Sequence, residues 1–299
     1  QNKALFREFL RENDFNVPYA KGYNNIDDAI KDSSLFNWPV IIKPVDSAGS
    51  KGVTKVTKIE ELKKAAEYAI NFSKTDKFIM EEFIEKKGNS TDSDSFSVNN
   101  ELIVTTFNNQ YFDNNVINPY TPAAFSWPSD MELSAQEELK SELQRLIKLL
   151  NLGTSIYNIE TRQGIDGKTY IMEVSPRGGG NRLSELLKYA TGIDLIECSI
   201  RAAIGEKIEL KKSDIEYKGY WAEIILHSDR DGLFDSIYIE DEIKNNVIEK
   251  DLWIKEGDQI HRFTGANEAF GTLVMCFENK TDLDKVMNNI SDYIKINLK

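Results

Sequence analysis

The sequence holds very few of the residues from which disulfide frameworks and multi-histidine metal centres are built. Among its 299 residues there are two cysteines, Cys198 and Cys276, and two histidines, His227 and His261. Two cysteines cannot form a disulfide framework, and these two show no metal-ligand spacing, so we expect buried thiols in a reducing compartment. Two histidines also exclude a metal site built from several histidines.

Long apolar runs and an excess of basic residues are missing as well. No stretch approaches the roughly 18 apolar residues that a membrane-spanning helix needs, which excludes a membrane protein. The 37 Lys and Arg residues are outnumbered by 49 Asp and Glu, giving a formal net charge of −12. Nonspecific nucleic-acid binding needs basic side chains to neutralise phosphates, so neither a nucleic acid nor a membrane is an expected partner. The remaining expectation is a cytoplasmic enzyme that acts on small molecules.

The chain begins at Gln1 without a methionine, and apolar residues recur at helical spacing from Leu5 onward. Ordered structure at the very start predicts a piece of a longer protein. The length suits one large domain or two to three small ones. Hydrophobic periodicity predicts helices at 2–13, 26–33, 58–72, 136–150, 182–190, 193–204 and 281–297. It predicts strands at 39–44, 53–56, 78–84, 154–161, 169–174, 219–226, 247–254 and 271–277, with two more between 96 and 112.

The order strand, glycine-rich loop, strand, helix, strand between residues 39 and 84 predicts an α+β nucleotide-binding lobe. The first strand ends on Lys43, whose point charge suits an α- or β-phosphate. The loop 46–52 is rich in small residues, so its backbone N–H groups can close over phosphate oxygens. We therefore predict that the nucleotide is bound by Lys43, Ser47, Gly49, Ser50 and Gly52. A surface hairpin with a solvated lysine is the alternative, and the Walker A pattern Gly-x-x-x-x-Gly-Lys-Ser/Thr is absent.

The strand over residues 78–84 leaves this lobe with main chain that can hydrogen-bond an adenine edge. Phe83 or Ile84 would line the base, and an acid at Glu81 or Glu82 would accept from its exocyclic amine. The alternative is a pair of solvated glutamates at the end of a strand.

The strands 154–161 and 169–174 carry the strongest signal for a site. If the turn is centred on 165–166, Glu173 faces Asn158 and Glu160 faces Ile171. One face then holds Asn158, Glu160, Arg162, Ile171, Glu173 and Ser175. The two glutamates become diagonal neighbours roughly 7–8 Å apart, and they repel unless a cation such as Mg²⁺ lies between them with substrate phosphates. Two solvated glutamates on an exposed face are the alternative.

The next segment, 176–182, adds Arg177, Arg182 and three glycines directly beyond the carboxylates. Metal and arginine together are the usual means of neutralising charge at a transferring phosphoryl group. The segment 118–130 contains three prolines and is predicted to form no regular element. Its part 118–128 is either a substrate-facing loop or a loop folded against the core, and the absence of Lys, Arg and His from 88 to 139 favours the second.

Taken in order, these pieces resemble the ATP-grasp superfamily over a run from about 3 to 205. The resemblance implies that Lys43 binds phosphate and that the loop 47–52 closes over the triphosphate. It implies that the segment 81–84 binds adenine, mainly through the main chain of Glu82 and Ile84.

The same resemblance implies that Glu160 and Glu173 bind magnesium. Ser175 stands where many members have a third ligand, an asparagine. Arg177 matches the arginine that contacts the γ-phosphate or an acyl-phosphate, so Lys43, Arg177 and Asn181 are the predicted catalytic residues. The implied cofactors are ATP and Mg²⁺, with Mn²⁺ as a substitute.

The implied architecture is the ATP-grasp fold, in which two α+β lobes hold ATP between them, followed by a small β-rich domain. The expected divisions are 1–35 as a linker from a missing amino-terminal domain, 36–88 as the small lobe, 89–207 as the large lobe with the metal site, and 208–299 as the β-rich domain. The last part is similar to the branch of glycinamide ribonucleotide synthetase, biotin carboxylase and L-amino-acid ligase. The signatures Asn-Thr-Gly-Gly-Met-Gly and Gln-Val-Glu-His of the first two are absent.

In enzymes of this superfamily a carboxylate attacks the γ-phosphate of MgATP, and an amine then displaces phosphate from the acyl-phosphate. No protein nucleophile or histidine base is needed, which agrees with the scarcity of histidine. We therefore expect a carboxylate–amine ligase with small-molecule substrates, and a homodimer as is common among relatives. An ATP-dependent carboxylase or small-molecule kinase is the first alternative, and a non-catalytic nucleotide-binding module is the second.

Overall fold

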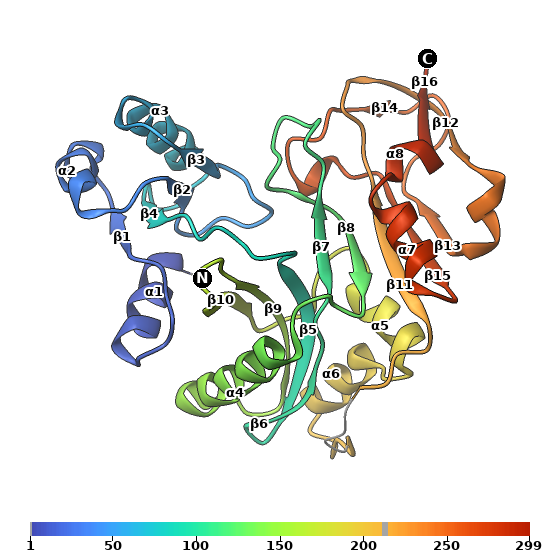
Figure 1. Cartoon of the computed structure of the whole chain (residues 1–299), viewed down its shortest axis with the longest axis horizontal. Helices are drawn as coiled ribbons and strands as arrows, with labels where there is room; N and C mark the ends of the chain where they lie inside the picture. The colour runs from blue at the N-terminus through green and yellow to red at the C-terminus, as the bar shows by residue number, and fades with distance from the viewer. Residues whose placement is uncertain (1, 211–214) are drawn as a thin grey trace.

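A computed structural model describes residues 2–210 and 215–299, and within them four antiparallel sheets are packed with helices (Figure 1). The α+β class predicted from the sequence is confirmed. The expected boundary near 205–214 lies partly outside the described residues, as does Gln1. No helix in the described part of the chain is long and apolar enough to span a bilayer.

The small lobe is a four-stranded sheet in the order β1-β4-β2-β3, with α2 and α3 on one face and the start of α1 against the other (Figure 1). Its elements are α1 (Lys3–Glu12), β1 (Ala20–Tyr23), α2 (Ile26–Asp32), β2 (Val40–Pro44), β3 (Thr54–Val56), α3 (Ile59–Ile70) and β4 (Phe78–Glu82). Helix α3 presents Leu62, Ala66 and Ala69, each fully buried, to Val40 and Ile42 of the sheet. This apolar contact fixes β2, and with it the position of the strand end that carries the predicted phosphate-binding lysine.

The large lobe is a second four-stranded sheet in the order β10-β9-β5-β6. Its elements are β5 (Thr91–Val98), β6 (Glu101–Thr105), α4 (Leu133–Leu150), β9 (Ser155–Gln163), β10 (Thr169–Ser175), α5 (Leu183–Thr191) and α6 (Leu195–Ala203). Helix α4 covers one face through a cluster that includes Leu143, Tyr157 and Ile159. The other face is covered by α5 around Phe96 and Ile156, and the half of this face nearer the small lobe carries polar side chains instead.

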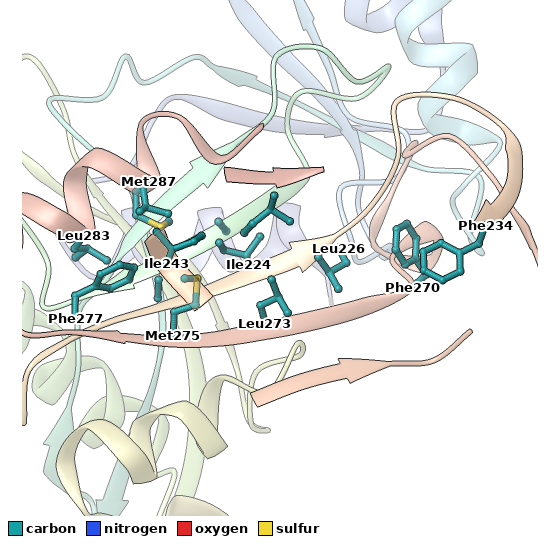
Figure 2. Close-up of a cluster of buried hydrophobic side chains, with 14 of the residues drawn as sticks. Ile224, Leu226, Phe234, Ile243, Phe270, Leu273, Met275, Phe277, Leu283 and Met287 are labelled. Carbon is teal, nitrogen blue, oxygen red and sulfur yellow. The ribbon is translucent and has the colours of Figure 1, made fainter. Parts of the chain in front are cut away.

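The remaining strands form a five-stranded sheet, β13-β15-β11-β8-β7, and a three-stranded one, β14-β12-β16. The elements are β7 (Asn109–Phe112), β8 (Pro122–Trp127), β11 (Tyr220–Leu226), β12 (Gly232–Ile239), β13 (Val247–Leu252), β14 (Gln259–Ile260), β15 (Gly271–Phe277), α7 (Lys280–Met287), α8 (Ile290–Tyr293) and β16 (Ile294–Leu298). Figure 2 shows their shared core, in which Ile224, Leu273 and Met275 from the sheet meet Leu283 and Met287 of α7. Three short 3-10 helices complete the described elements: Ser33–Leu35, Asp241–Asn246 and Ala266–Glu268.

Two expectations about the elements are wrong. The segment 118–130 contains a regular strand, β8, in the five-stranded sheet, because Pro122 stands at its first position, where a missing N–H is tolerated. The predicted closing helix 281–297 ends at Met287, and the alternating Ile294, Ile296 and Leu298 form β16 instead. The strands β1, β12 and β14 were not predicted. The domain divisions remain predictions, although β8 and β11, which are paired, lie on opposite sides of the expected division at 207.

Candidate active site

Three acidic side chains lie in one row across the polar half of the large-lobe sheet. Glu160 of β9 is paired directly with Glu173 of β10 on one side and with Asp92 of β5 on the other. Residues paired in this way point to the same face, with Cα atoms about 4.5–5.5 Å apart. The predicted carboxylate pair is therefore brought together.

The register of the hairpin differs from the expected one. The predicted pairing of Glu173 with Asn158 and of Glu160 with Ile171 is wrong. Next to the turn the strands are paired one residue away from the expected register, with Ile171 opposite Thr161, and a bulge between Ile171 and Glu173 adds a second shift. The extra residue, at position 172, sets the two glutamates directly opposite each other. The shift next to the turn places Ile171 on the other face, where it is 3% exposed and packs in the cluster beneath α4.

Sequence analysis missed Asp92 and Asp94. The side chain of Asn158 donates to Asp92 Oδ1 at 2.7 Å and to Asp94 Oδ1 at 3.3 Å. Burial, together with the nearby charge of Glu160, raises the pKa of Asp92 to about 7, and burial also raises the pKa of Asp94. The alternation of these two acids with Phe96 is a strand signal that would have placed them on this face, but the predicted strand began only at Phe96.

Ser175, a predicted metal ligand, lies next to the carboxylate pair. Its Oγ donates to Glu173 Oε1 at 3.3 Å, and the residue is 6% exposed. Across residues 2–210 and 215–299 no three His, Cys, Asp or Glu side chains are arranged to hold a metal ion by themselves. A cation between Glu160 and Glu173 would therefore draw other ligands from a bound substrate or from water, as Mg²⁺ commonly does.

The glycine-rich loop between β2 and β3 folds back toward the large lobe. Three of its residues have positive φ: Gly49 at 69°, Ser50 at 56° and Gly52 at 71°. Ser50 Oγ donates to the carbonyl of Tyr120 at 2.8 Å. The side chain of Asn118 donates to the carbonyls of Ser50 at 2.9 Å and Thr264 at 3.2 Å. The start of the segment 118–128 thus contacts the glycine-rich loop, whereas its later part lies in the sheet as β8.

Lys3 joins this loop to the carboxylate pair. Its Nζ donates to the carbonyl of Ser47 at 2.8 Å and lies 3.4 Å from Glu173 Oε2. Sequence analysis did not single out Lys3, although it lies four residues before Arg7 on α1 and so on the same helix face. The Lys3 ammonium group therefore contacts both Ser47, a predicted phosphate-loop residue, and Glu173, a predicted metal ligand.

Lys43 is held by an acid at the end of β4. Lys43 Nζ donates to Glu81 Oε1 at 2.8 Å, and Arg7 Nε donates to Glu81 Oε2 at 2.5 Å. Burial works to raise the pKa of Glu81, but the charges of Arg7 and Lys43 outweigh it and lower this pKa to about 2. Burial lowers the pKa of Lys43, against the opposing effect of Glu81. The Glu81 side chain is 1% exposed and lies between the two cations, rather than facing a base as the sequence suggested.

The predicted adenine segment runs from the end of β4 toward the large lobe. Glu82 ends the strand, and Lys55 Nζ lies 3.9 Å from the centre of the Phe83 ring. The carbonyl of Ile84 accepts from Arg162 Nη1 at 3.2 Å. A binding role of Glu82, Phe83 and Ile84 toward adenine stays a prediction.

Arg177 starts the turn that leaves β10. Its Nη1 donates to the carbonyl of Gly178 at 2.7 Å and approaches Asn158 Oδ1 at 3.5 Å, with the rest of the side chain exposed. The N–H of Gly179 donates to Asp94 Oδ1 at 2.8 Å, which ties the turn to the floor of the site. The Arg177 guanidinium thus lies near Asn158, beside the acidic side chains of the sheet.

The second arginine of the turn points elsewhere. Asn181 and Arg182 have positive φ, at 55° and 68°, and lead directly into α5. Arg182 Nη2 lies 2.5 Å from Glu249 Oε2 on β13. Its charge is therefore directed toward the carboxy-terminal part of the chain, whereas Asn181 remains in the turn beyond the carboxylates.

Residues 1–181 match the family model of the ATP-grasp domain. The match covers more than half of the sequence, and the chain belongs to the ATP-grasp family. The resemblance inferred from the motifs is confirmed.

Relatives by sequence are distant. The chain is 24% identical over 304 residues to an uncharacterized protein, y4rH, of Sinorhizobium fredii, which covers 98% of this chain and 60% of that protein. It is 23% identical over 227 residues to the carbamoyl phosphate synthase large chain of Thermoanaerobacter sp., covering 75% of this chain and 20% of that one. The chain thus spans 60% or less of the length of these two relatives.

Solved structures share its fold over nearly the whole chain. The L-amino acid ligase from Bacillus licheniformis has a TM-score of 0.84 at 19% identity, covering 100% of this chain and 73% of the ligase. Phosphoribosylglycinamide synthetase from Anaerococcus prevotii has a TM-score of 0.66 at 22% identity, covering 98% of this chain and 72% of the synthetase. The biotin carboxylase domain of a Hydrogenobacter thermophilus 2-oxoglutarate carboxylase, solved with MgADP, has a TM-score of 0.74 at 18% identity, covering 100% and 67%. These are the enzymes of the predicted branch.

Proposed function

We propose that this chain forms the ATP site of a Mg²⁺-dependent ligase that activates a carboxylate as an acyl-phosphate for attack by an amine. One observation carries the proposal: Lys3 Nζ reaches both the carbonyl of Ser47 and the carboxylate of Glu173, at 2.8 Å and 3.4 Å. The glycine-rich loop, a lysine and the carboxylate pair therefore meet at one point. A triphosphate needs this set of groups, because it carries several charges that must be neutralised together.

The carboxylate pair fits magnesium in its chemistry. Glu160 and Glu173 offer only oxygen donors, from directly opposed positions, and Mg²⁺ prefers one or two carboxylates completed by phosphate and water oxygens. Mn²⁺ accepts the same donors and is the proposed substitute. When bound, the ion would withdraw charge from the phosphoryl oxygens.

The chain's own residues supply the remaining functions. Lys43, oriented by Glu81, neutralises charge on the phosphates, while the main chain of Glu82 and Ile84 borders the adenine. Arg177 extends an exposed guanidinium from the turn, where it stabilises charge on the γ-phosphate and then on the acyl-phosphate. Asn181, four residues further along the same turn, borders the acid and the amine.

Exclusion of water is the task of the glycine-rich loop. An acyl-phosphate hydrolyses readily, so a closed loop protects it until the amine attacks. Asn118, which donates to the carbonyls of Ser50 and Thr264, would hold the loop in that position. Substrate specificity then depends on the side chains around the closed loop.

Three finer assignments belong to the same proposal. Both substrates are small molecules, the protein acts in the cytoplasm, and it forms a homodimer. The biotin carboxylase domain of the Hydrogenobacter thermophilus 2-oxoglutarate carboxylase forms a dimer, which supports the last of these. The second candidate is a carboxylase, favoured by the shared fold with that relative but not by the chain's motifs, which lack Gln-Val-Glu-His.

Hydroxylamine trapping tests the activated carboxylate. The protein is incubated with MgATP, pooled carboxylic acids and hydroxylamine, and hydroxamates are identified by mass spectrometry. The proposal predicts a hydroxamate of one acid, formed together with ADP and absent for Glu173→Gln. A stable phosphate ester without hydroxamate would instead establish a kinase, and tight ATP binding with no product from any acid would establish a binding module.

A further inference from the structure

Helix α1 inserts a buried arginine between the two lobes. Arg7 is 3% exposed, and in Figure 1 its helix lies between β1 of the small lobe and β10 of the large lobe. Its Nε donates to Glu81 Oε2 of the small lobe at 2.5 Å. Its Nη1 donates to the carbonyl of Met172 in the large lobe at 2.8 Å. One guanidinium therefore bridges the two lobes.

The large-lobe contact falls on the bulge of β10. Pairing is regular up to Ile171 opposite Thr161, and it resumes with Glu173 opposite Glu160, so Met172 is the extra residue. If Met172 were not bulged, it would lie opposite Glu160, and Glu173 would lie opposite Ile159, on the face that packs against α4. The bulge is thus the reason that Glu173 faces the site, and Arg7 holds the carbonyl of the bulged residue.

The small-lobe contact leads to the phosphate lysine. Glu81 is 1% exposed and uses its second oxygen to accept from Lys43 Nζ at 2.8 Å. The carboxylate has two buried cationic partners, and its orientation is fixed by both of them. A shift of Arg7 would therefore shift Glu81 and, with it, Lys43.

We propose that Arg7 is a positioning residue, which couples Lys43 of the small lobe to Glu173 of the large lobe through Glu81 and the carbonyl of Met172. The roles of Lys43 and Glu173 rest on the proposed function, whereas the coupling rests on these contacts alone. An arginine suits this position because its planar group offers several donors in fixed directions. A lysine offers one compact ammonium, so Arg7→Lys can keep the contact with Glu81 or the contact with Met172 but not both.

The test compares Arg7→Met with Arg145→Met in the full chain. Arg145 is a matched control, because its guanidinium also bonds a backbone carbonyl, that of Asn13 at 2.6 Å, and a carboxylate, that of Glu142 at 2.6 Å. It anchors the end of α1 away from the site. Arg7→Met leaves Glu81 paired with Lys43, so no buried carboxylate is left without a counter-charge.

The first measurement needs no nucleotide. Amide hydrogen exchange is followed in peptides that cover 169–175, the strand with the bulge. Loss of a hydrogen bond from a charged donor predicts exchange about tenfold or more faster in this strand for Arg7→Met and unchanged exchange for Arg145→Met. Equal exchange in Arg7→Met and the wild type, or equal acceleration by both variants, would overturn the coupling. If Arg7→Met does not fold, Arg7→Lys takes its place, with a smaller acceleration expected.

The second measurement uses ATP and Mg²⁺ as probes. The Mg²⁺ concentration that gives half-maximal ATP binding is expected to rise about tenfold in Arg7→Met and to stay unchanged in Arg145→Met. Only Arg7→Met loses the hydrogen bond to the carbonyl of Met172 in the bulge. A wild type that does not bind MgATP would contradict the proposed function, while the exchange measurement still decides the coupling. A wild type and Arg7→Met with the same Mg²⁺ dependence would leave the function in place and overturn the positioning role.

Discussion

The buried carboxylate of Glu81 allows a quantitative prediction for Glu81→Gln. This substitution leaves Arg7 and Lys43 buried side by side without their shared counter-charge. The pKa of Glu81 is about 2 instead of 4.5, a difference of roughly 2.5, and each pH unit corresponds to about 1.4 kcal/mol. The ionised carboxylate therefore contributes about 3 kcal/mol at pH 7, which agrees with the usual cost of about 3–5 kcal/mol for breaking a buried ion pair.

The sign of the pH dependence follows from the direction of this shift. Because the pKa of Glu81 is lower in the folded state than in the unfolded state, its contribution is complete above pH 4.5 and is lost as the pH falls toward 2. The difference between the wild type and Glu81→Gln is therefore expected to be largest at pH 6–7 and to shrink on acidification below 4.5. No loss of this contribution is expected between pH 6 and 8.

Urea unfolding followed by tryptophan fluorescence measures the effect, since Trp38 packs against the small-lobe core. Glu82→Gln is the control, because Glu82 Oε1 accepts from the backbone N and the Nδ2 of Asn37, both at 2.8 Å, at a partly exposed position. We expect a loss of about 1 kcal/mol or less for this neutral exchange at a solvent-accessible hydrogen bond. Equal stability of Glu81→Gln and the wild type at pH 7, or a difference that persists at pH 2.5, would refute the reasoning.

Three further substitutions have defined outcomes. Glu173→Gln should abolish turnover with an unchanged melting temperature, and an active variant would place the metal elsewhere. Gly52→Ala should lower the free energy of unfolding by about 1–3 kcal/mol, more than Gly88→Ala does. Both glycines have φ near 70°, but only at Gly52 would a Cβ meet a neighbour, the Phe72 ring at 3.0 Å. Equal losses for the two variants in urea unfolding would contradict this. Glu223 is fully buried, neither of its oxygens has a hydrogen-bond partner within the described residues, and burial raises its pKa well above 4.5. Its contribution to stability is therefore lost as the pH rises above 4.5, so Glu223→Gln should become more stable relative to the wild type between pH 5 and pH 8, and a constant difference would be evidence against this burial effect.

The sequence predicted the carboxylate pair because strand periodicity is local. Alternation along 154–161 and 169–174 is enough to place Glu160 and Glu173 on one face of a hairpin. The alternation does not fix the centre of the turn, which pairs the strands one residue away from the expected register. The bulge at Met172 also leaves no mark in the alternation, and it shifts the partner of Glu173 by one more residue. A diagonal pair was expected, and a direct pair was found.

Other parts of the site depend on contacts between distant segments. Lys3 and Arg7 share a helix face, but only the packing of α1 between the lobes shows what they contact. Glu81 was predicted from its neighbours in sequence to face adenine, whereas Lys43 and Arg7, far from it along the chain, determine its orientation. The strand β16 was predicted as helix, because its short alternation follows directly on a helical segment. Its partner, β12, lies far away in the sequence, for example Ile237 opposite Ile296, and local periodicity does not reveal such a partner.

Nucleotide product analysis tests the central claim most directly. The full-length protein is incubated with MgATP, pooled carboxylic acids and pooled amines, beside the Glu173→Gln variant, and the nucleotides are separated. A ligase that works through an acyl-phosphate predicts ADP and phosphate, formed only when both an acid and an amine are present and lost in the variant. Release of AMP and pyrophosphate would contradict the account, and with it the roles given to Glu160, Glu173 and Arg177.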